Sequence, residues 1–249
     1  MHKNNLDLFS EMNLQSDVIF CNQSNSNEYL ETEIASHKVK MVTTDLRGVG
    51  KNRNLGLMYA SKDISLLADE DVVYYNGYND IITNAYQKIS DADMILFALD
   101  FESERQSKDI PKVKRLRLYN ALKFGAVNIS FLNDKLKKNQ ISFNEMFGGG
   151  SEFVSGEDSL FLLDCLKNKM KIYVYPEKIG RVEDTNSTWY QGVNDEFLQS
   201  KGAFISAAFK MAKYPLLIYF SIKFTFKYSL KFSYVLKQLW VGNIRYQNI

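Results

Sequence analysis

Three consecutive carboxylates, Asp69-Glu70-Asp71, stand between two apolar runs at residues 64–67 and 72–75. Carboxylates are rarely buried without a partner, and in α/β sheets such groups are typical of the carboxyl ends of strands, where ligands bind. Hard oxygen ligands suit Mg²⁺ or Mn²⁺, and Mg²⁺ is usually held by one or two carboxylates together with substrate phosphates. The triplet therefore predicts a divalent-cation site and a phosphorylated substrate, with a solvated acidic turn as the alternative.

A basic loop punctuated by glycine runs from residue 47 to residue 54 and leads into a segment with the apolar spacing of a helix. The N-terminus of a helix attracts phosphate because its first backbone N–H groups have no partner within the helix. Lys51 and Arg53 lie at this start, and a guanidinium group neutralises and orients a diphosphate well. Both residues are therefore candidates for donor binding, although an ordinary surface ion pair would also account for Arg53.

A glycine run at residues 148–150 precedes an acidic pair, Glu157 and Asp158, which opens an apolar helical segment. A glycine loop of this kind permits a mobile lid over a substrate, or it is a flexible connection only. Ser155 and Asp158 also match a helix-capping pattern, and the helix dipole favours acids in a first turn. Asp158 is thus a candidate general base, with helix capping as the alternative.

The elements that must position these groups alternate between strand and helix. Apolar runs predict strands at residues 17–21, 39–43, 64–67, 72–75, 94–99, 127–131 and 172–175. Helices are expected after residue 50, at 77–88 and at 156–169, while polar or glycine-rich stretches at 22–27, 102–115 and 142–155 predict loops and a charged connector. This alternation favours an α/β fold with a mainly parallel, doubly wound sheet and flanking helices.

The chain has 249 residues, of which 45% are apolar. This length and composition are enough to bury a full core in one α/β domain with an appendage. Cys21 and Cys165 belong to no C-x-x-C pair, so a disulfide framework or a zinc site is not expected and a reducing cytosol fits. No export signal is recognisable, and the longest apolar run near the end, residues 216–220, is far shorter than the ~20 residues of a spanning helix. We expect a cytoplasmic location.

The last fifty residues form a separate electrostatic region, because all 29 acidic residues lie at or before Glu196. Lys223, Lys227 and Lys231 recur every four residues and predict one basic face of an amphipathic helix between 213 and 240, with aromatic side chains beside it. Such a helix suits the surface of an anionic membrane. Packing against the rest of the chain is the alternative, and nucleic acid is not an expected partner because the acidic body would repel it.

Taken in order along residues 17–202, these motifs resemble the family 2 glycosyltransferases of the GT-A fold, in particular bacterial enzymes that build capsules and other surface polysaccharides. The order of the motifs carries the resemblance more than any one of them. It implies that Asp71 binds the metal of a D-x-D motif, that Asp69 approaches the donor ribose or assists at the metal, and that Asp158 is the general base. The resemblance also implies donor-binding and acceptor-side roles for Asn22, Lys51, Arg53, Gly149, Gly150 and Glu157.

The implied activity is a metal-dependent, inverting, hexosyltransferase-like reaction. A sugar would pass from a nucleotide-diphosphate donor, UDP-linked by expectation, to a lipid-linked saccharide at the inner face of the cell membrane. Such a transfer needs a base for the acceptor hydroxyl, Mn²⁺ or Mg²⁺ for the departing diphosphate, and an in-line geometry. Residues 1–200 would form the catalytic domain and residues 201–249 the basic aromatic tail.

Two departures from the family pattern keep other functions open. The first clear strand here is the one that relatives have second, so the first strand of the fold is apparently missing, and Glu183 or Asp184 stands where relatives often carry a metal-binding His. A non-catalytic GT-A-like module that binds membrane or partner enzymes is therefore one alternative. A nucleotidyltransferase is another, although its glycine-rich basic loop after a first strand has no counterpart here.

Overall fold

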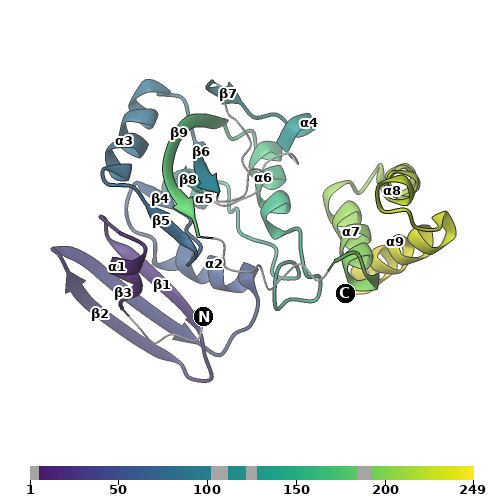
Figure 1. Cartoon of the computed structure of the whole chain (residues 1–249), viewed down its shortest axis with the longest axis horizontal. Helices are drawn as coiled ribbons and strands as arrows, with labels where there is room; N and C mark the ends of the chain where they lie inside the picture. The colour runs from purple at the N-terminus through teal and green to yellow at the C-terminus, as the bar shows by residue number, and fades with distance from the viewer. Residues whose placement is uncertain (1–5, 102–111, 122–127, 184–191) are drawn as a thin grey trace. The chain divides into compact units, whose positions relative to one another are not determined.

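The computed structural model describes residues 6–101, 112–121, 128–183 and 192–249, and its chain divides into two compact units. The first unit comprises residues 1–46, 52–142 and 162–187, and the second comprises residues 47–51, 143–161 and 188–249. Figure 1 shows the order of the elements from the N-terminus to the C-terminus.

The described residues of the first unit form two β-sheets (Figure 1). The smaller sheet has the order β1-β3-β2 and comprises β1 (Val18–Gln23), β2 (Glu28–Ile34) and β3 (His37–Thr44). The larger sheet has the order β4-β8-β6-β9-β5, with β7 pairing with β9 outside this path. Its strands are β4 (Ile64–Leu66), β5 (Val72–Tyr74), β6 (Met94–Phe101), β7 (Lys114–Arg115), β8 (Ile129–Leu132) and β9 (Ile172–Val182).

The α/β class with flanking helices is confirmed, but the expectation of a mainly parallel sheet is wrong. Among the described strands, β1 pairs with β3 and β6 with β9 in parallel, whereas the other pairings are antiparallel. One reason is a tight hairpin between β2 and β3, where Ala35 and Ser36 have φ values of 48° and 66°. Left-handed backbone at both central residues matches the twist of paired antiparallel strands. The alternation of strands and helices along the sequence predicts where these elements lie, but it does not determine whether neighbouring strands pair in parallel or antiparallel.

Helices cover the sheets and complete the core of the first unit. The helices that precede residue 170 are α1 (Leu8–Glu11), α2 (Val49–Tyr59), α3 (Tyr78–Lys88), α4 (Leu118–Ala121), α5 (Asn133–Lys138) and α6 (Glu157–Lys167), of which α2 and α6 contribute residues to both units. α3 presents Tyr78, Ile82 and Ala85 to a core that includes Ile95 of β6 and Ile179 of β9. The apolar run that predicted β6 is buried because the sheet is covered.

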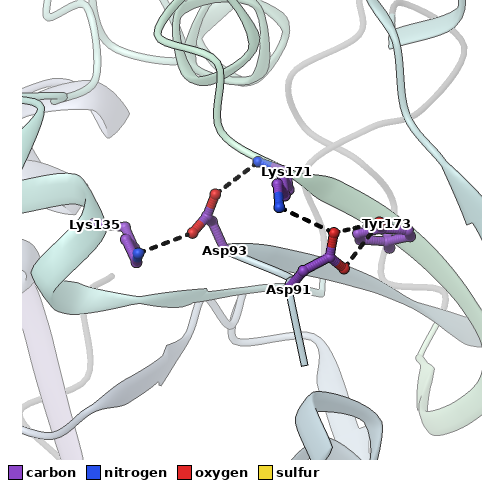
Figure 2. A network of polar contacts seen from close by, with 5 residues as sticks. All are labelled: Asp91, Asp93, Lys135, Lys171 and Tyr173. Atoms are coloured by element: carbon purple, nitrogen blue, oxygen red, sulfur yellow. Dashed lines mark hydrogen bonds and ion pairs between the residues drawn. The ribbon is translucent and has the colours of Figure 1, made fainter. Parts of the chain in front are cut away.

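A network of polar contacts fixes the amino ends of β6 and β9 in the first unit (Figure 2). Asp93 accepts a hydrogen bond of 2.8 Å from the backbone N–H of Lys171 and lies 3.4 Å from the Lys135 ammonium of α5. Asp91 pairs with the Lys171 ammonium at 3.1 Å and accepts a hydrogen bond of 3.0 Å from the Tyr173 hydroxyl. These two partners lower the pKa of Asp91. The network has a structural role, since each carboxylate has a fixed cationic partner.

The tail forms three helices in the second unit, where the sequence predicted one between 213 and 240. They are α7 (Asp195–Ala208), α8 (Lys213–Tyr228) and α9 (Phe232–Gln247). Ser229 ends α8 in the left-handed conformation with φ of 54°, and Lys231 is the N-cap of α9. Lys231 therefore does not continue the α8 face that carries Lys223 and Lys227, so the predicted stripe of three lysines is wrong.

These helices share a core of their own, formed by Leu198, Ile205, Leu217, Phe224, Val235 and Leu239. α7 and α9 approach so closely that a Cβ on Gly242 would lie 1.8 Å from the Gln199 carbonyl oxygen. Only glycine permits that approach, because any side chain would collide with the facing backbone. Among the described helices, none is both long and apolar enough to cross a membrane.

α7 and α9 also pack against residues 143–161 within the second unit. The ring of Tyr246 lies 5.8 Å from that of Phe147 and 6.2 Å from that of Phe153, and the Val154 N–H donates a 3.0 Å hydrogen bond to the Ser200 hydroxyl. Packing against the rest of the chain, the alternative to a membrane-bound helix, is therefore observed for α7 and α9. These two helices and residues 143–161 form one compact unit.

Candidate active site

The acidic triplet lies in the connection from β4 to β5, in the first unit. Arg53 of α2 reaches Asp69 with a distance of 3.2 Å between Nη2 and Oδ1. The Arg53 side chain is 13% exposed, whereas that of Asp69 is 45% exposed. The structure thus brings together two predicted donor-site residues. Arg53 does form an ion pair, as the alternative proposed, but its partner is Asp69, itself a predicted site residue.

Asp71 lies in an electrostatic environment that disfavours its charged form. Its pKa is raised by burial, then by the charge of Asp69, with a smaller effect from Glu70. The neighbouring Tyr74 is buried, and the charges of Asp69 and Asp71 add to burial in raising its pKa. A carboxyl group whose negative charge is disfavoured in this way is a good position for a cation.

Glu183, one of the two residues offered in place of a metal-binding His, does not complete a cluster among the described residues. β5 and β9 pair so that Glu183 lies next to Asp71 along the strands, and its N–H donates a 2.9 Å hydrogen bond to the Asp71 carbonyl oxygen. The Glu183 carboxylate instead contacts Arg181 at 3.1 Å, and Asp184 lies outside the described residues. Within the described ranges, no group of three His, Cys, Asp or Glu side chains could hold a metal.

Two carboxylates fit a divalent cation only where the substrate supplies further ligands. Asp71 and Asp69 offer hard oxygen atoms, and Mg²⁺ is typically bound by one or two carboxylates plus phosphate oxygens. The site therefore fits Mg²⁺ or Mn²⁺ bound together with a diphosphate. It does not match a structural metal site, which would bring a full set of protein ligands.

The end of β1 lies beside the same helix that carries Arg53. Asn22 is buried there, and the Asn52 side chain of α2 donates a 2.9 Å hydrogen bond to the Cys21 carbonyl oxygen. This bond ties the start of α2 to the carboxyl end of β1. Asn22 therefore occupies the strand end that the sequence predicted for a donor contact, with its side chain within the fold.

The second unit holds the other predicted site residues. Lys51 is half-buried in the first turn of α2, and the first N–H of that helix, from Val49, donates a 3.0 Å hydrogen bond to the Gly149 carbonyl oxygen. The basic loop and the glycine run are therefore in direct contact. One of the helix N–H groups expected to bind phosphate is used to hold the glycine run.

Glu157 closes over the start of α6. Its Oε2 accepts a 3.0 Å hydrogen bond from the Gly156 N–H, and a Cβ on Gly148 would lie 3.0 Å from its Cδ. Gly148 has φ of 104°, a conformation that side chains rarely adopt, so glycine is favoured at this position. Glu157 thus accepts a hydrogen bond from the residue that precedes α6, while Asp158 follows in the first turn of the helix and is half-buried.

Lys201 of α7 is a neighbour of Glu157 that sequence reasoning missed. Its ammonium donates a 3.2 Å hydrogen bond to the Ser155 hydroxyl and lies 5.1 Å from the centre of the Phe197 ring. Burial lowers the pKa of Lys201, the charge of Glu157 opposes this effect, and Lys227 adds to it. A signal was present, because Lys201 is the only charged residue between Glu196 and Lys210.

Comparison with known proteins supports the architecture. No family model matches the chain, and no curated protein matches it. Among solved structures, residues 1–349 of TarS from S. aureus superpose with a TM-score of 0.52 at 19% identity, over 69% of this chain and 49% of that one. The fold is GT-A-like. A longer TarS structure gives the same TM-score and identity over 75% of this chain and 33% of that one.

This likeness concerns the fold, since identity is only 19%. The chain spans about half the length of the shorter TarS structure and a third of the longer one. Within the fold, the predicted site residues fall into two groups. Asn22, Arg53, Asp69 and Asp71 belong to the first unit, whereas Lys51, Gly149, Gly150, Glu157 and Asp158 belong to the second.

Proposed function

We propose that this chain is a metal-dependent, inverting glycosyltransferase that moves a sugar from a UDP-linked or similar nucleotide-diphosphate donor to a lipid-linked saccharide of a surface polysaccharide. The observation that carries the proposal is the position of the acidic triplet in a GT-A-like fold, where Asp71 is half-buried next to Asp69 and Asp69 pairs with Arg53 at 3.2 Å. The raised pKa of Asp71, caused by burial and by Asp69, agrees with it. TarS, a teichoic acid glycosyltransferase, supports the class of product. An acidic turn in open solvent would not carry such a shift.

The first unit would bind the donor. Asp71 and Asp69 would hold Mn²⁺ or Mg²⁺, which supplies charge stabilisation for a departing diphosphate. Arg53 already lies against Asp69 and carries a fixed positive charge close to the position of that diphosphate in this proposal. Asn22 would contact the donor from the end of β1.

The second unit would serve the acceptor. Asp158 would accept the proton of the attacking hydroxyl, since a carboxylate within hydrogen-bond reach of the hydroxyl is sufficient as a base. Glu157 holds the start of α6 through the Gly156 N–H, so the two acids have different tasks in this proposal. Gly149 and Gly150 would border the acceptor, and Lys51 would add positive charge beside them.

The decisive experiment measures release of nucleoside diphosphate from a panel of nucleotide sugars with Mn²⁺, with and without saccharide acceptors. Asp158→Asn should lower transfer by about 10²–10⁴-fold with donor affinity retained, because an amide cannot accept the proton. Glu157→Gln is the matched control. We expect it to lower the melting temperature and to leave the rate of transfer nearly unchanged. Unchanged transfer in Asp158→Asn would remove the assignment of the base.

The same assay separates the other functions. Release of pyrophosphate in place of nucleoside diphosphate would identify a nucleotidyltransferase. If no nucleotide sugar binds or turns over with Mn²⁺ or Mg²⁺, the chain is a non-catalytic GT-A-like module.

A further inference from the structure

The outward face of α8 is apolar where a solvated helix would be polar. Leu217, Ser221 and Phe224 face the core of the second unit. On the opposite side Ile218, Ile222 and Phe226 recur every four residues, and all three are exposed, Phe226 to 82%. An exposed helix face normally carries charged and polar residues, and single exposed apolar residues are common, but a continuous stripe is not. We call these three residues and Tyr219 the α8 face.

Exposed apolar residues also lie just before α8, in its first turn and on α9. Met211, just before α8, is 99% exposed, and Tyr214 in its first turn is exposed as well. The ring of Tyr214 lies 5.6 Å from that of Trp240 on α9, and Ile244 is exposed one turn further along α9. Tyrosine and tryptophan are typical of surfaces that contact the boundary between lipid and water.

Lysines border this surface on one side. Lys223 and Lys227 follow Ile222 and Phe226 by one residue each, and their ammonium groups lie 5.5 Å and 5.0 Å from the ring centres of Phe220 and Tyr228. The stems of these lysines therefore run along aromatic surface while the charges remain at the border. The sequence holds no acidic residue after Glu196.

We infer that the α8 face docks on an anionic lipid bilayer, with α8 lying flat in the interface. Charge selects this occupant, because a second copy of the chain would bring one lysine border against another, whereas anionic headgroups complement it. α8 has 16 residues, and none of the described helices could span a membrane, so the apolar side chains would enter only the headgroup and upper acyl region. The inference does not depend on the proposed transferase activity.

Deleting the tail would not test this inference, because Leu217 and Leu239 belong to one core and Tyr246 contacts Phe147. The test uses the full chain with Ile218→Ser, Ile222→Ser and Phe226→Ser combined, in flotation with phosphatidylglycerol vesicles and with phosphatidylcholine vesicles. We expect at least a tenfold loss of binding to anionic vesicles. Leu30→Ser with Met58→Ser, two exposed apolar positions of the first unit, is the matched control and should bind as the parent does.

A second set of variants tests the lysines that border the α8 face. Lys223→Gln with Lys227→Gln should weaken binding to anionic vesicles by about tenfold or more at low salt, since each lysine near anionic lipid contributes about 1 kcal/mol. Binding of the parent should also weaken as salt rises. Lys138→Gln with Lys169→Gln, exposed lysines of the first unit, is the matched control. Emission of Trp240 should shift to shorter wavelength on vesicles, and the shift should be lost in Trp240→Phe.

Three results would overturn the inference. The parent chain could fail to bind anionic vesicles at low salt, or the triple variant could bind as tightly as the parent. Sedimentation could instead show that the parent is a dimer, that it binds no vesicles and that the triple variant is a monomer. That result would assign the α8 face to a second copy of the chain. Far-ultraviolet circular dichroism checks that each variant is folded. Donor hydrolysis in lipid-free solution reports separately on the proposed activity.

Discussion

Two Asp-x-Asp sequences of the first unit have the same spacing and opposite environments. Asp91-Ala92-Asp93 is tied to Lys171, Lys135 and Tyr173 at the amino ends of β6 and β9 (Figure 2). Hydrogen bonds from Lys171 and Tyr173 keep the pKa of Asp91 low. In Asp69-Glu70-Asp71 the cation Arg53 pairs with Asp69, and the pKa of Asp71 is raised by burial and by the charge of Asp69. The spacing alone therefore does not identify a cation site. The environments differ, and the raised pKa of Asp71 is what makes Asp69-Glu70-Asp71 the proposed cation site.

The largest expected difference between the two sequences concerns nucleotide binding. Asp71→Ala should lower the Mn²⁺-dependent affinity for UDP by about 100-fold or more, because it removes the proposed metal ligand. Asp91→Ala, at the exposed end of the other sequence, should leave that affinity unchanged. Calorimetric titration with and without Mn²⁺ measures both. Equal metal-dependent affinity in Asp71→Ala and the parent would break the comparison.

A second variant separates the roles of Arg53. Arg53→Met keeps the length of the side chain but removes the charge, and it should weaken UDP binding by about tenfold, since a charge-assisted contact to phosphate is lost. Arg181→Met, which removes the exposed ion pair with Glu183, is the control and should not change UDP binding. A loss of melting temperature without a change in UDP affinity would show that Arg53 only supports Asp69.

The two sequences should also differ in the sign of their effect on stability. Asp71→Asn removes a disfavoured charge and should raise the melting temperature of the metal-free chain by about 1–3 °C at neutral pH. Asp93→Asn weakens a partly buried ion pair and should lower it by about 2–5 °C. Thermal unfolding followed by circular dichroism measures both. A destabilised Asp71→Asn would show that Asp71 is a structural residue.

The smallest effect is a dependence on pH. The pKa of Asp71 is raised in the folded chain above its ordinary value of 3.8. At pH values between the ordinary pKa and the raised pKa, the folded chain therefore binds more protons than the unfolded chain. The contribution of Asp71 to the free energy of unfolding therefore falls as pH rises through that window. The advantage of Asp71→Asn over the parent should grow from pH 4 upwards and then level off, as urea midpoints would show. Asp91, with its lowered pKa, contributes stability that is lost as pH falls.

Much of the fold could be predicted from the sequence because burial leaves a mark on composition. The apolar runs at 39–43, 94–99 and 172–175 lie in β3, β6 and β9, which supply much of the core. β2 was missed, since most of its residues are exposed and three of its seven residues are glutamates, and its hairpin turn uses Ala35 and Ser36 where glycine or asparagine is usual. The break after α8 was missed for a similar reason, because Ser229 takes a left-handed conformation without a glycine.

The site divides in the same way. Residue type and order predicted Asp69, Asp71 and Arg53, and the structure brings Arg53 against Asp69. The sequence could not show that the tail helices share a unit with residues 143–161, because the ring contacts of Tyr246 join positions about ninety residues apart. Lys201 was missed since its neighbour Glu157 comes from a distant segment.

The contact of Tyr246 with Phe147 and Phe153 has a thermodynamic consequence. α9 carries Trp240 of the exposed apolar surface, and its Tyr246 packs on the rings that flank the glycine run. One rigid element therefore serves both places, and a coupling free energy can exist between them. Such coupling would be reciprocal: if the glycine run borders a saccharide and the α8 face binds lipid, as proposed, a vesicle would change the affinity for the saccharide by the same factor as the saccharide changes the affinity for vesicles.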